Sequence, residues 1–240
     1  MNFKLLLILF VLIVSCKKVN DRNCWKKNGE NKILNISQNE VDIVSIYDNI
    51  SLTLINDSLD LISIKAPENL INLIELTTLQ NELSIHNLNK CDFIRKPSEI
   101  EIFYHYTALN QVDLYGFGRL TNQNKIEHEI DVNSFLAYSN IELNLNNNSS
   151  KIKIFGGSSA IKINGNCDNL YCYNSGLGPV DAKNLTSRKI HIHSNSIANA
   201  EILASDTLII EIRNNGSVYY SGEPSVASYS ITGNGEIINL

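Results

Sequence analysis

A turn signal made of small residues returns about every nineteen residues through the second half of the chain. Its occurrences are Gly116-Phe117-Gly118, Tyr138-Ser139-Asn140, Gly156-Gly157-Ser158, Gly176-Leu177-Gly178, Ser194-Asn195-Ser196, Asn214-Asn215-Gly216 and Gly233-Asn234-Gly235. A fixed period of this size indicates stacked repeats, because a single repeat is too short to bury its own apolar face. Such a stack has long exposed faces and no obvious crevice, which favours a structural or binding protein over an enzyme.

Weaker turn signals divide each repeat into two strand-plus-turn units. They are Asn146-Asn147-Asn148, Asn164-Gly165-Asn166, Lys183-Asn184, Ser205-Asp206 and Gly222-Glu223-Pro224. Two strands per repeat predict an all-β fold, a right-handed β-solenoid of two packed parallel sheets with about 19 residues per rung. Alternation along the strands predicts which side chains point into the core. These are Ile152 and Ile154, Ile161 and Ile163, Ile190 and Ile192, and Leu208 and Ile210.

Residues 33–106 contain strand-like runs without a tight repeat. We expect this irregular β section to cap or extend a regular solenoid at 107–240. The expected strands are Val41 to Ile55, interrupted at Tyr47-Asp48-Asn49, then Leu59 to Lys65, Glu82 to His86 and Glu99 to Tyr106. Leu70 to Leu76 fits a helical turn or a strand equally well. The repeat is weakest at 121–135, where Glu127-His128-Glu129 interrupts the apolar pattern.

The N-terminus has the pattern of an export signal followed by a lipid-attachment cysteine. Leu5 to Val14 is an unbroken apolar run, well short of the roughly 20 residues that span a bilayer as a helix. Ile13-Val14-Ser15-Cys16 then fits a bacterial lipobox. We therefore predict a signal peptide at 1–15, acylation of Cys16, and a tether at 16–32. By resemblance to Gram-negative lipoproteins, the absence of Asp after Cys16 favours the outer membrane, facing either the periplasm or the outside.

Charge and cysteine content narrow the choice of partners. The net charge of −5 provides no basic surface for nucleic acid. Export permits disulfides, and we favour a bridge between Cys24 and Cys91. Cys167 and Cys172 could pair across a turn or remain buried thiols. No spacing of Cys and His typical of zinc sites is present, so we expect neither a metal nor another cofactor.

Candidate chemistry is sparse and each candidate has a simpler explanation. His191 and His193 share a strand face and could bind a metal, but inward Ile190 and Ile192 would leave them on a solvated outer face. The carboxylate pairs Glu99/Glu101 and Glu127/Glu129 could serve glycoside cleavage, although solvent-facing positions explain them equally well. Tyrosines are the most suggestive surface set. Four are possible ligand-facing aromatics, Tyr171, Tyr173, Tyr219 and Tyr220.

The C-terminal turns resemble the closing pattern of a known family. The segment from Asn214 to Pro224 runs on to Gly233-Asn234-Gly235-Glu236-Ile237, and matching pieces occur at Tyr47 to Leu54, Lys90 to Arg95 and Tyr115 to Gly118. This pattern is similar to that of the auto-transporter adhesin, head GIN domain family, over about residues 33–240. The resemblance implies a two-sheeted β-superhelix and a role in adhesion, with no catalytic residues. Ser194-Asn195-Ser196 and Tyr138-Ser139-Asn140 depart from its glycine turns.

Together these features predict a non-enzymatic lipoprotein of the cell envelope that adheres to or binds a surface. Its partners would be the membrane, through the lipid anchor, and a glycan or an envelope protein. A structural envelope component without a dedicated ligand is the first alternative. An enzyme acting on polysaccharide is the second. The sequence leaves the ligand and the oligomeric state open.

Overall fold

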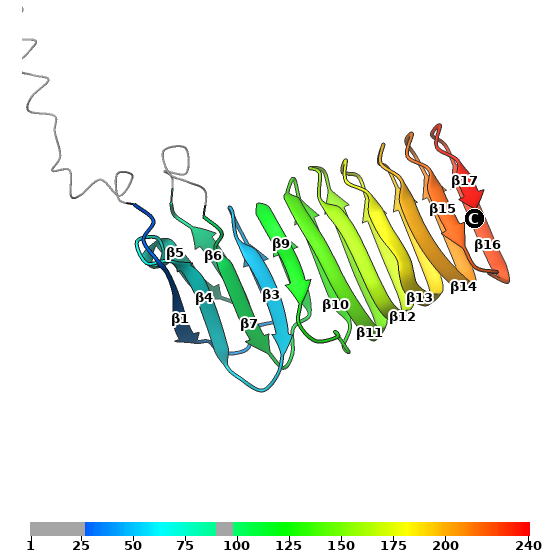
Figure 1. Cartoon of the computed structure of the whole chain (residues 1–240). Helices are drawn as coiled ribbons and strands as arrows, with labels where there is room; N and C mark the ends of the chain where they lie inside the picture. Colours follow the sequence, from blue (N-terminus) through cyan, green and yellow to red (C-terminus); the bar gives the residue numbers. More distant parts are fainter. Residues whose placement is uncertain (1–26, 90–97) are drawn as a thin grey trace, which may run out of the picture.

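The computed structural model describes residues 27–89 and 98–240 and shows an elongated stack of strands (Figure 1). Within this part of the chain, helical structure is limited to a single 3₁₀ turn, η3 (Ile71–Leu73). The strands are β1 (Asn31–Ser37), β2 (Ile43–Ile46), β3 (Ser51–Asn56), β4 (Leu61–Pro67), β5 (Ile74–Leu79), β6 (Glu82–Asn87), β7 (Glu101–Tyr106), β8 (Gln111–Leu114), β9 (Phe117–Asn122), β10 (Ile130–Phe135), β11 (Tyr138–Phe155), β12 (Ala160–Asn174), β13 (Val180–Ser194), β14 (Ala200–Ile212), β15 (Val218–Ser221), β16 (Val226–Ile231) and β17 (Ile237–Asn239).

The strands form two faces that enclose one core. Sheet I contains β1, β4, β7, β3 and β9, then the first halves of β11 to β14, then β15 and β17. Sheet II contains β5, β6, β2, β8 and β10, then the second halves of β11 to β14, then β16. Because β11 to β14 each pass through both faces, all strands belong to one hydrogen-bonded network.

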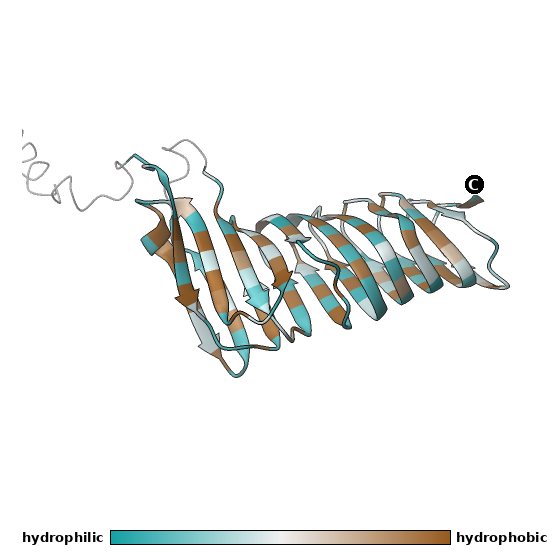
Figure 2. Cartoon of the chain, turned by 60° about the horizontal axis from the view of Figure 1, so that its bottom comes forward, coloured by the Kyte–Doolittle hydropathy of each residue, from teal (hydrophilic) through white to brown (hydrophobic). Residues whose placement is uncertain are grey.

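The register of the parallel strands confirms the predicted period. Ile141 pairs with Ile161, Ile161 with Val180, and Val180 with Ala200, so each rung advances the sequence by about nineteen residues. The predicted inward pairs are buried, for example Ile152 and Ile154. Figure 2 shows the resulting alternation of apolar and polar bands along the strands. The fold is therefore the β-solenoid that the repeat predicts.

The midway turns differ from the prediction, because the chain does not break there. β11, β12, β13 and β14 are continuous strands of 18, 15, 15 and 13 residues that bend from sheet I into sheet II. Pairing of β11 with β12 continues on both sides of the bend, so few backbone hydrogen bonds are lost. Gly165 lies in the bend of β12 with φ +100°, and a Cβ there would come 2.2 Å from the Leu145 carbonyl oxygen. The small residues at these positions therefore allow bending within a strand.

The rungs of the N-terminal section are stacked out of chain order. β2 pairs in parallel with both β6 and β8, and β3 pairs with both β7 and β9. The rung formed by β2 and β3 therefore lies between two rungs that follow it in sequence. Antiparallel β4, β1 and β5 then cover the end of the stack. The stacking thus begins well inside the section 33–106, and the antiparallel strands form its cap.

The local predictions for this section are largely confirmed. Strands β2 and β3 flank the expected interruption at Tyr47-Asp48-Asn49, and β4, β6 and β7 occupy the other predicted runs. The ambiguous run Leu70 to Leu76 contains the 3₁₀ turn η3 followed by the start of β5. The weak stretch 121–135 includes a loop at 123–129 in which Ile126 is buried and bridges to Leu145.

The cysteines of the core are free thiols. Cys167 and Cys172 are both buried and unpaired, so the alternative of buried thiols holds for them. Cys172 lies in the inward row between Ile152 and Ile192, and complete burial raises its pKa to about 12. Cys16, Cys24 and Cys91 lie outside the described residues. The predicted acylation and the predicted Cys24–Cys91 bridge therefore stay predictions.

We expect Gly157→Ala to destabilise the fold by about 2 kcal/mol or more, because the site requires a left-handed backbone and close packing. Gly157 has φ +74°, and a Cβ would lie 2.1 Å from the Ala137 carbonyl oxygen. Chemical denaturation would measure the change in the free energy of unfolding. Ser158→Ala, one residue along the same turn, should change it by less than about 0.5 kcal/mol. Equal stabilities for the two variants would contradict this account of the turn.

Candidate functional site

One outer face of the solenoid has a ladder of stacked aromatic rings. The first five rings stand at one position of successive rungs on sheet II, and the last two stand two residues earlier in the register. Neighbouring centroids are 4.1–5.4 Å apart. The members of this aromatic ladder are His86, Tyr47, Tyr115, Phe135, Phe155, Tyr173 and His193. From His86 to Phe155 the ring planes differ by only 5–15°, so these rings cover one another's faces and present their edges to solvent.

The ladder forms because parallel strands in register place equivalent side chains above one another. Phe135 pairs with Phe155 across β10 and β11, and both follow a buried residue of sheet II. Each stacked pair contributes roughly 0.5–1.5 kcal/mol beyond the area that it buries. Burial, and then the carboxylates of Glu82 and Asp113, raise the pKa of Tyr47, so its hydroxyl keeps its proton at neutral pH. Sequence reasoning missed this ladder, although an aromatic residue directly before successive turns was a visible signal.

At its C-terminal end the ladder opens into a mixed cluster of rings and charges. Tyr171 meets His191 at an interplanar angle of 77°, and Tyr173 meets His193 at 89°. At a T-shaped contact one ring of the pair turns its face away from the stacking direction. The β12–β14 cluster, as we name it, consists of Tyr171, Tyr173, His191, His193, Glu211 and Arg213. Its rings are half-buried and project from the outer face of sheet II.

Glu211 holds the charged side of this cluster together. His191 Nε2 donates a hydrogen bond to Glu211 Oε1 at 2.9 Å, and Arg213 Nη2 donates to Oε2 at 3.2 Å. The hydrogen bond from His191 holds the pKa of Glu211 below its usual range. Burial lowers the pKa of His193, which favours its neutral form. The cluster therefore combines aromatic rings with a fixed carboxylate, a guanidinium and a neutral imidazole.

A shallow hollow of about 200 Å³ adjoins the cluster. It is bounded by Ser149, Lys151, Asn169, Leu170, Tyr171, Lys189 and His191. Aromatic, hydroxyl, amide and ammonium groups thus meet at one open depression. This combination suits a polar ligand with apolar faces, such as a sugar, better than a small apolar molecule.

The four tyrosines predicted to face a ligand do not form one patch. Tyr171 and Tyr173 project from sheet II, whereas Tyr219 pairs with Glu201 on the outer face of sheet I. Tyr220 is the inward neighbour of Tyr219 and contacts Tyr229 at the C-terminal end of the core. A hydrogen bond with Tyr220 raises the pKa of Tyr229 to about 12. Only the first two of the four therefore share a site.

The other predicted chemical groups have structural partners or stand apart. Lys65 Nζ donates to Glu101 Oε1 at 2.7 Å, which neutralises one member of the predicted carboxylate pair. Glu99 lines a separate open hollow of about 390 Å³ on sheet I, together with Ser51, Arg119 and Tyr138. Across residues 27–89 and 98–240, no group of three or more His, Cys, Asp or Glu side chains could hold a metal ion.

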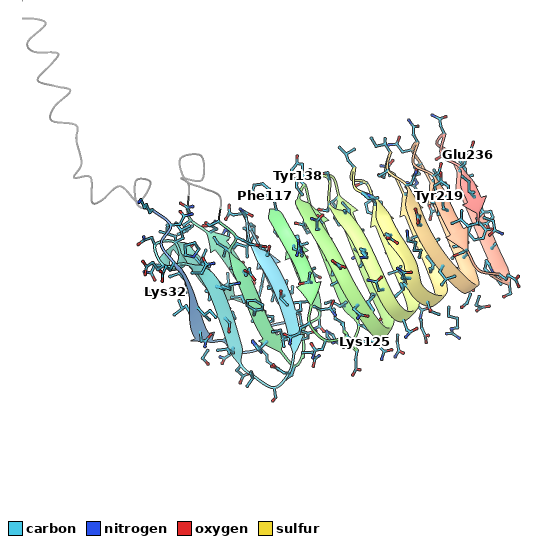
Figure 3. All side chains as sticks on the ribbon, in the orientation of Figure 1. Lys32, Phe117, Lys125, Tyr138, Tyr219 and Glu236 are labelled. Atoms are coloured by element: carbon cyan, nitrogen blue, oxygen red, sulfur yellow. The ribbon has the colours of Figure 1, made fainter. Side chains whose placement is uncertain are left out.

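At the corner that leads from sheet II back to sheet I, the usual distribution of polar and apolar side chains between surface and interior is reversed. Its buried side chains are polar: Ser159 and Ser134 hydroxyls hydrogen-bond at 2.8 Å, and Ser196 donates to the Gly176 carbonyl at 2.6 Å. Its exposed side chains are mostly apolar, with Asn195 and Asn199 as exposed polar exceptions. We call this set the apolar edge, and its members are Phe117, Leu136, Tyr138, Leu177 and Ile197, which are 54–75% exposed. The opposite corner carries charged residues, and Figure 3 shows Lys125 there, across the molecule from Phe117 and Tyr138.

Comparison with known proteins shows which family has this architecture. The family model for "Putative auto-transporter adhesin, head GIN domain" matches residues 41–224. The chain belongs to this family. The match covers both the out-of-order rungs and most of the regular stack of this head GIN domain. No curated protein matches the sequence.

Solved structures share the head GIN domain fold at low sequence identity. A putative adhesin from Bacteroides fragilis is 19% identical, with a TM-score of 0.76 and coverage of 88% of this chain and 97% of that chain. A putative lipid binding protein from Parabacteroides distasonis is 18% identical, with a TM-score of 0.63 and coverage of 89% and 98%. A putative adhesin from Parabacteroides merdae is 16% identical, with a TM-score of 0.58 and coverage of 89% and 98%. These proteins are named for adhesion or binding rather than for catalysis.

The described part of the head GIN domain contains no helix of the length and apolarity needed to cross a membrane.

We expect Glu211 to stabilise the fold above the pKa of an unfolded glutamate and to lose that contribution in acid. Its folded pKa is lowered, mainly by the His191 hydrogen bond, so stability falls as the pH drops from about 5 through the folded pKa. Thermal unfolding as a function of pH would compare the protein with Glu211→Gln. The variant should lose less stability than the parent over this range. Glu236→Gln, at an exposed turn, is the matched control, and identical acid profiles for all three proteins would contradict the prediction.

Proposed function

We propose that this head GIN domain protein is a non-enzymatic lipoprotein of the outer membrane that binds a glycan or an envelope protein through its solenoid. Cys16 would provide the lipid anchor, and the tether would hold the stack of rungs away from it. The family and the Bacteroides fragilis relative, both described as a "putative" adhesin, support a binding role. The lipobox at Ile13 to Cys16 supports the anchor.

The observation that carries the proposal is the β12–β14 cluster. The ring of Tyr171 stands beside His191 and that of Tyr173 beside His193, and Glu211 and Arg213 provide a hydrogen-bond acceptor and donors. Sugar rings offer apolar faces for aromatic contact and hydroxyls for polar contact, and this cluster offers both. A glycan is accordingly the first ligand class to test, and an exposed loop of an envelope protein is the second.

A structural envelope component without a dedicated ligand is the competing function. It is favoured by the stacked half of the aromatic ladder, where rings from His86 to Phe155 cover one another's faces and are therefore less available to a ligand. The two functions predict different effects of substitutions in the cluster. Only ligand binding makes Tyr171 and Tyr173 more important than an equally exposed tyrosine elsewhere.

We expect Tyr171→Ala and Tyr173→Ala each to weaken binding at least about tenfold, because central aromatic contacts dominate interface energies. The measurement is an affinity for ligands found by screening the full chain against glycans and envelope proteins. Tyr219→Ala is the matched control, since this tyrosine projects from the opposite sheet. A screen without any ligand, or equal losses in all three variants, would favour the structural function.

We expect mass spectrometry of the protein from its native membrane to find an acylated N-terminal Cys16, because the lipobox directs cleavage before this residue. Cys16→Ser should release the protein from the membrane fraction, whereas Cys24→Ser should not. A mature N-terminus at any other position would contradict the anchor.

A further inference from the structure

The apolar edge is free of formal charge over five consecutive corners. None of the corner segments 115–118, 136–138, 155–159, 175–179 and 195–199 contains Asp, Glu, Lys or Arg. The corner on the other side of the stack carries charges at Lys125, Glu127, Asp168, Lys183, Arg188 and Asp206. Over these five corners the edge can therefore enter an apolar medium without desolvating an ion, whereas the opposite corner cannot.

The side chains of this edge are apolar although most of their surface is exposed. Leu136, Leu177 and Ile197 are 75%, 61% and 57% exposed, although polar or small residues occupy the equivalent tips of other rungs. Leu136 even adopts φ 51°, a conformation that disfavours a branched side chain. Large contiguous apolar patches on a protein surface mark contact with a partner or a membrane.

The chain enters the solenoid at this same edge. Asn31 at the start of β1 pairs with Pro67, Lys65 pairs with Glu101, and Glu101 pairs with Ser51 at the start of β3. The bridge between Asn49 and Phe117 then places the start of β3 beside the apolar edge. Figure 1 shows the described chain beginning at the upper side, where Figure 3 labels Phe117 and Tyr138.

The distances fit contact with the surface that holds the anchor. The chain from Cys16 to Lys27 reaches at most roughly 40 Å. Rungs are about 4.8 Å apart, so Ile197 lies only roughly 20 Å along the stack from Phe117. A chain anchored at Cys16 that enters the solenoid at this edge would therefore bring the edge within reach of the membrane.

We propose that the apolar edge docks on the lipid surface to which the chain is anchored, with Leu136, Leu177 and Ile197 entering the interfacial layer. This inference rests on the proposed anchoring at Cys16 and assigns the solenoid an orientation parallel to the membrane. Tyrosines favour the membrane–water interface, which suits Tyr138 at the same edge. A glycan is a poorer occupant, because the serine hydroxyls of this corner are buried and already hydrogen-bonded to the protein, and only Asn195 and Asn199 offer exposed polar side chains in the corner segments 175–179 and 195–199.

Depth-dependent fluorescence tests the orientation in the full chain. Trp25 is the single tryptophan, so Trp25→Phe gives a silent background for Leu177→Trp. Bound to phosphatidylethanolamine/phosphatidylglycerol vesicles, a tryptophan at 177 should shift to the blue and be quenched by brominated acyl chains. Thr186→Trp, exposed on the opposite corner, should show neither effect. Blue-shifted emission at 177 without bromine quenching would show a second copy or another protein instead, and would overturn the proposal.

A loss-of-binding experiment gives an independent readout. The double variant Leu177→Gln/Ile197→Gln should lower partitioning onto the same vesicles about tenfold or more, because two exposed apolar tips lose their contact with lipid. Its unfolding temperature should match that of the parent, as should that of the control Asn184→Gln/Thr186→Gln. Unchanged partitioning, or a full chain that never floats with vesicles, would overturn the proposal. Glycan or protein binding by the β12–β14 cluster is measured without vesicles, so a failure of that binding can be told apart from a failure of the apolar edge to dock on lipid.

Discussion

Parallel pairing in register, rung upon rung, is the constraint on which the rest of this structure depends. The step from Ile141 to Ile161 to Val180 brings the same position of every rung to the same place on the molecule. A residue type that recurs in sequence therefore becomes a line in space. The apolar core is such a line, and most members of the aromatic ladder and of the apolar edge also lie in line, each set at its own position of the rung.

The sequence predicted the features that depend on the repeat length and on the alternation of strand side chains between the two faces of a sheet. Alternation identified inward residues such as Ile152 and Ile154 because strand side chains alternate between faces with a period of two. The same rule shows why Tyr219 and Tyr220, as adjacent strand residues, could not share a face. It could not reveal that β2 lies between β6 and β8, because residues 33–106 have no repeat and these pairings are decided by long-range packing. The bends of β11 to β14 were also missed, since a bend and a break use the same small residues.

Side chains in turns do not alternate between faces as strand side chains do, and this explains why the apolar edge was not predicted. In Gly176-Leu177-Gly178 the two glycines mark the turn, and the leucine between them is the exposed tip of the corner. The inward position is taken by Asn174, whose side chain accepts from the Gly176 amide and donates to the Gly178 carbonyl, each at 2.9 Å. Because a buried corner must satisfy its backbone groups, polar side chains fill its inside. The exposed side chains of the corner are then not constrained by folding and can be selected for contact with a partner surface.

The interleaved order of the first rungs has a consequence for how proteins of this kind can change in length. From β11 to β14 each rung hydrogen-bonds with the rungs next to it in sequence, so a duplication or deletion of one whole repeat leaves every remaining register intact. β2 has no such freedom, because its two neighbours are both encoded later in the chain. The pairing therefore permits whole repeats to be gained or lost in the C-terminal half, whereas a change in the interleaved rungs would break the register on both sides of β2.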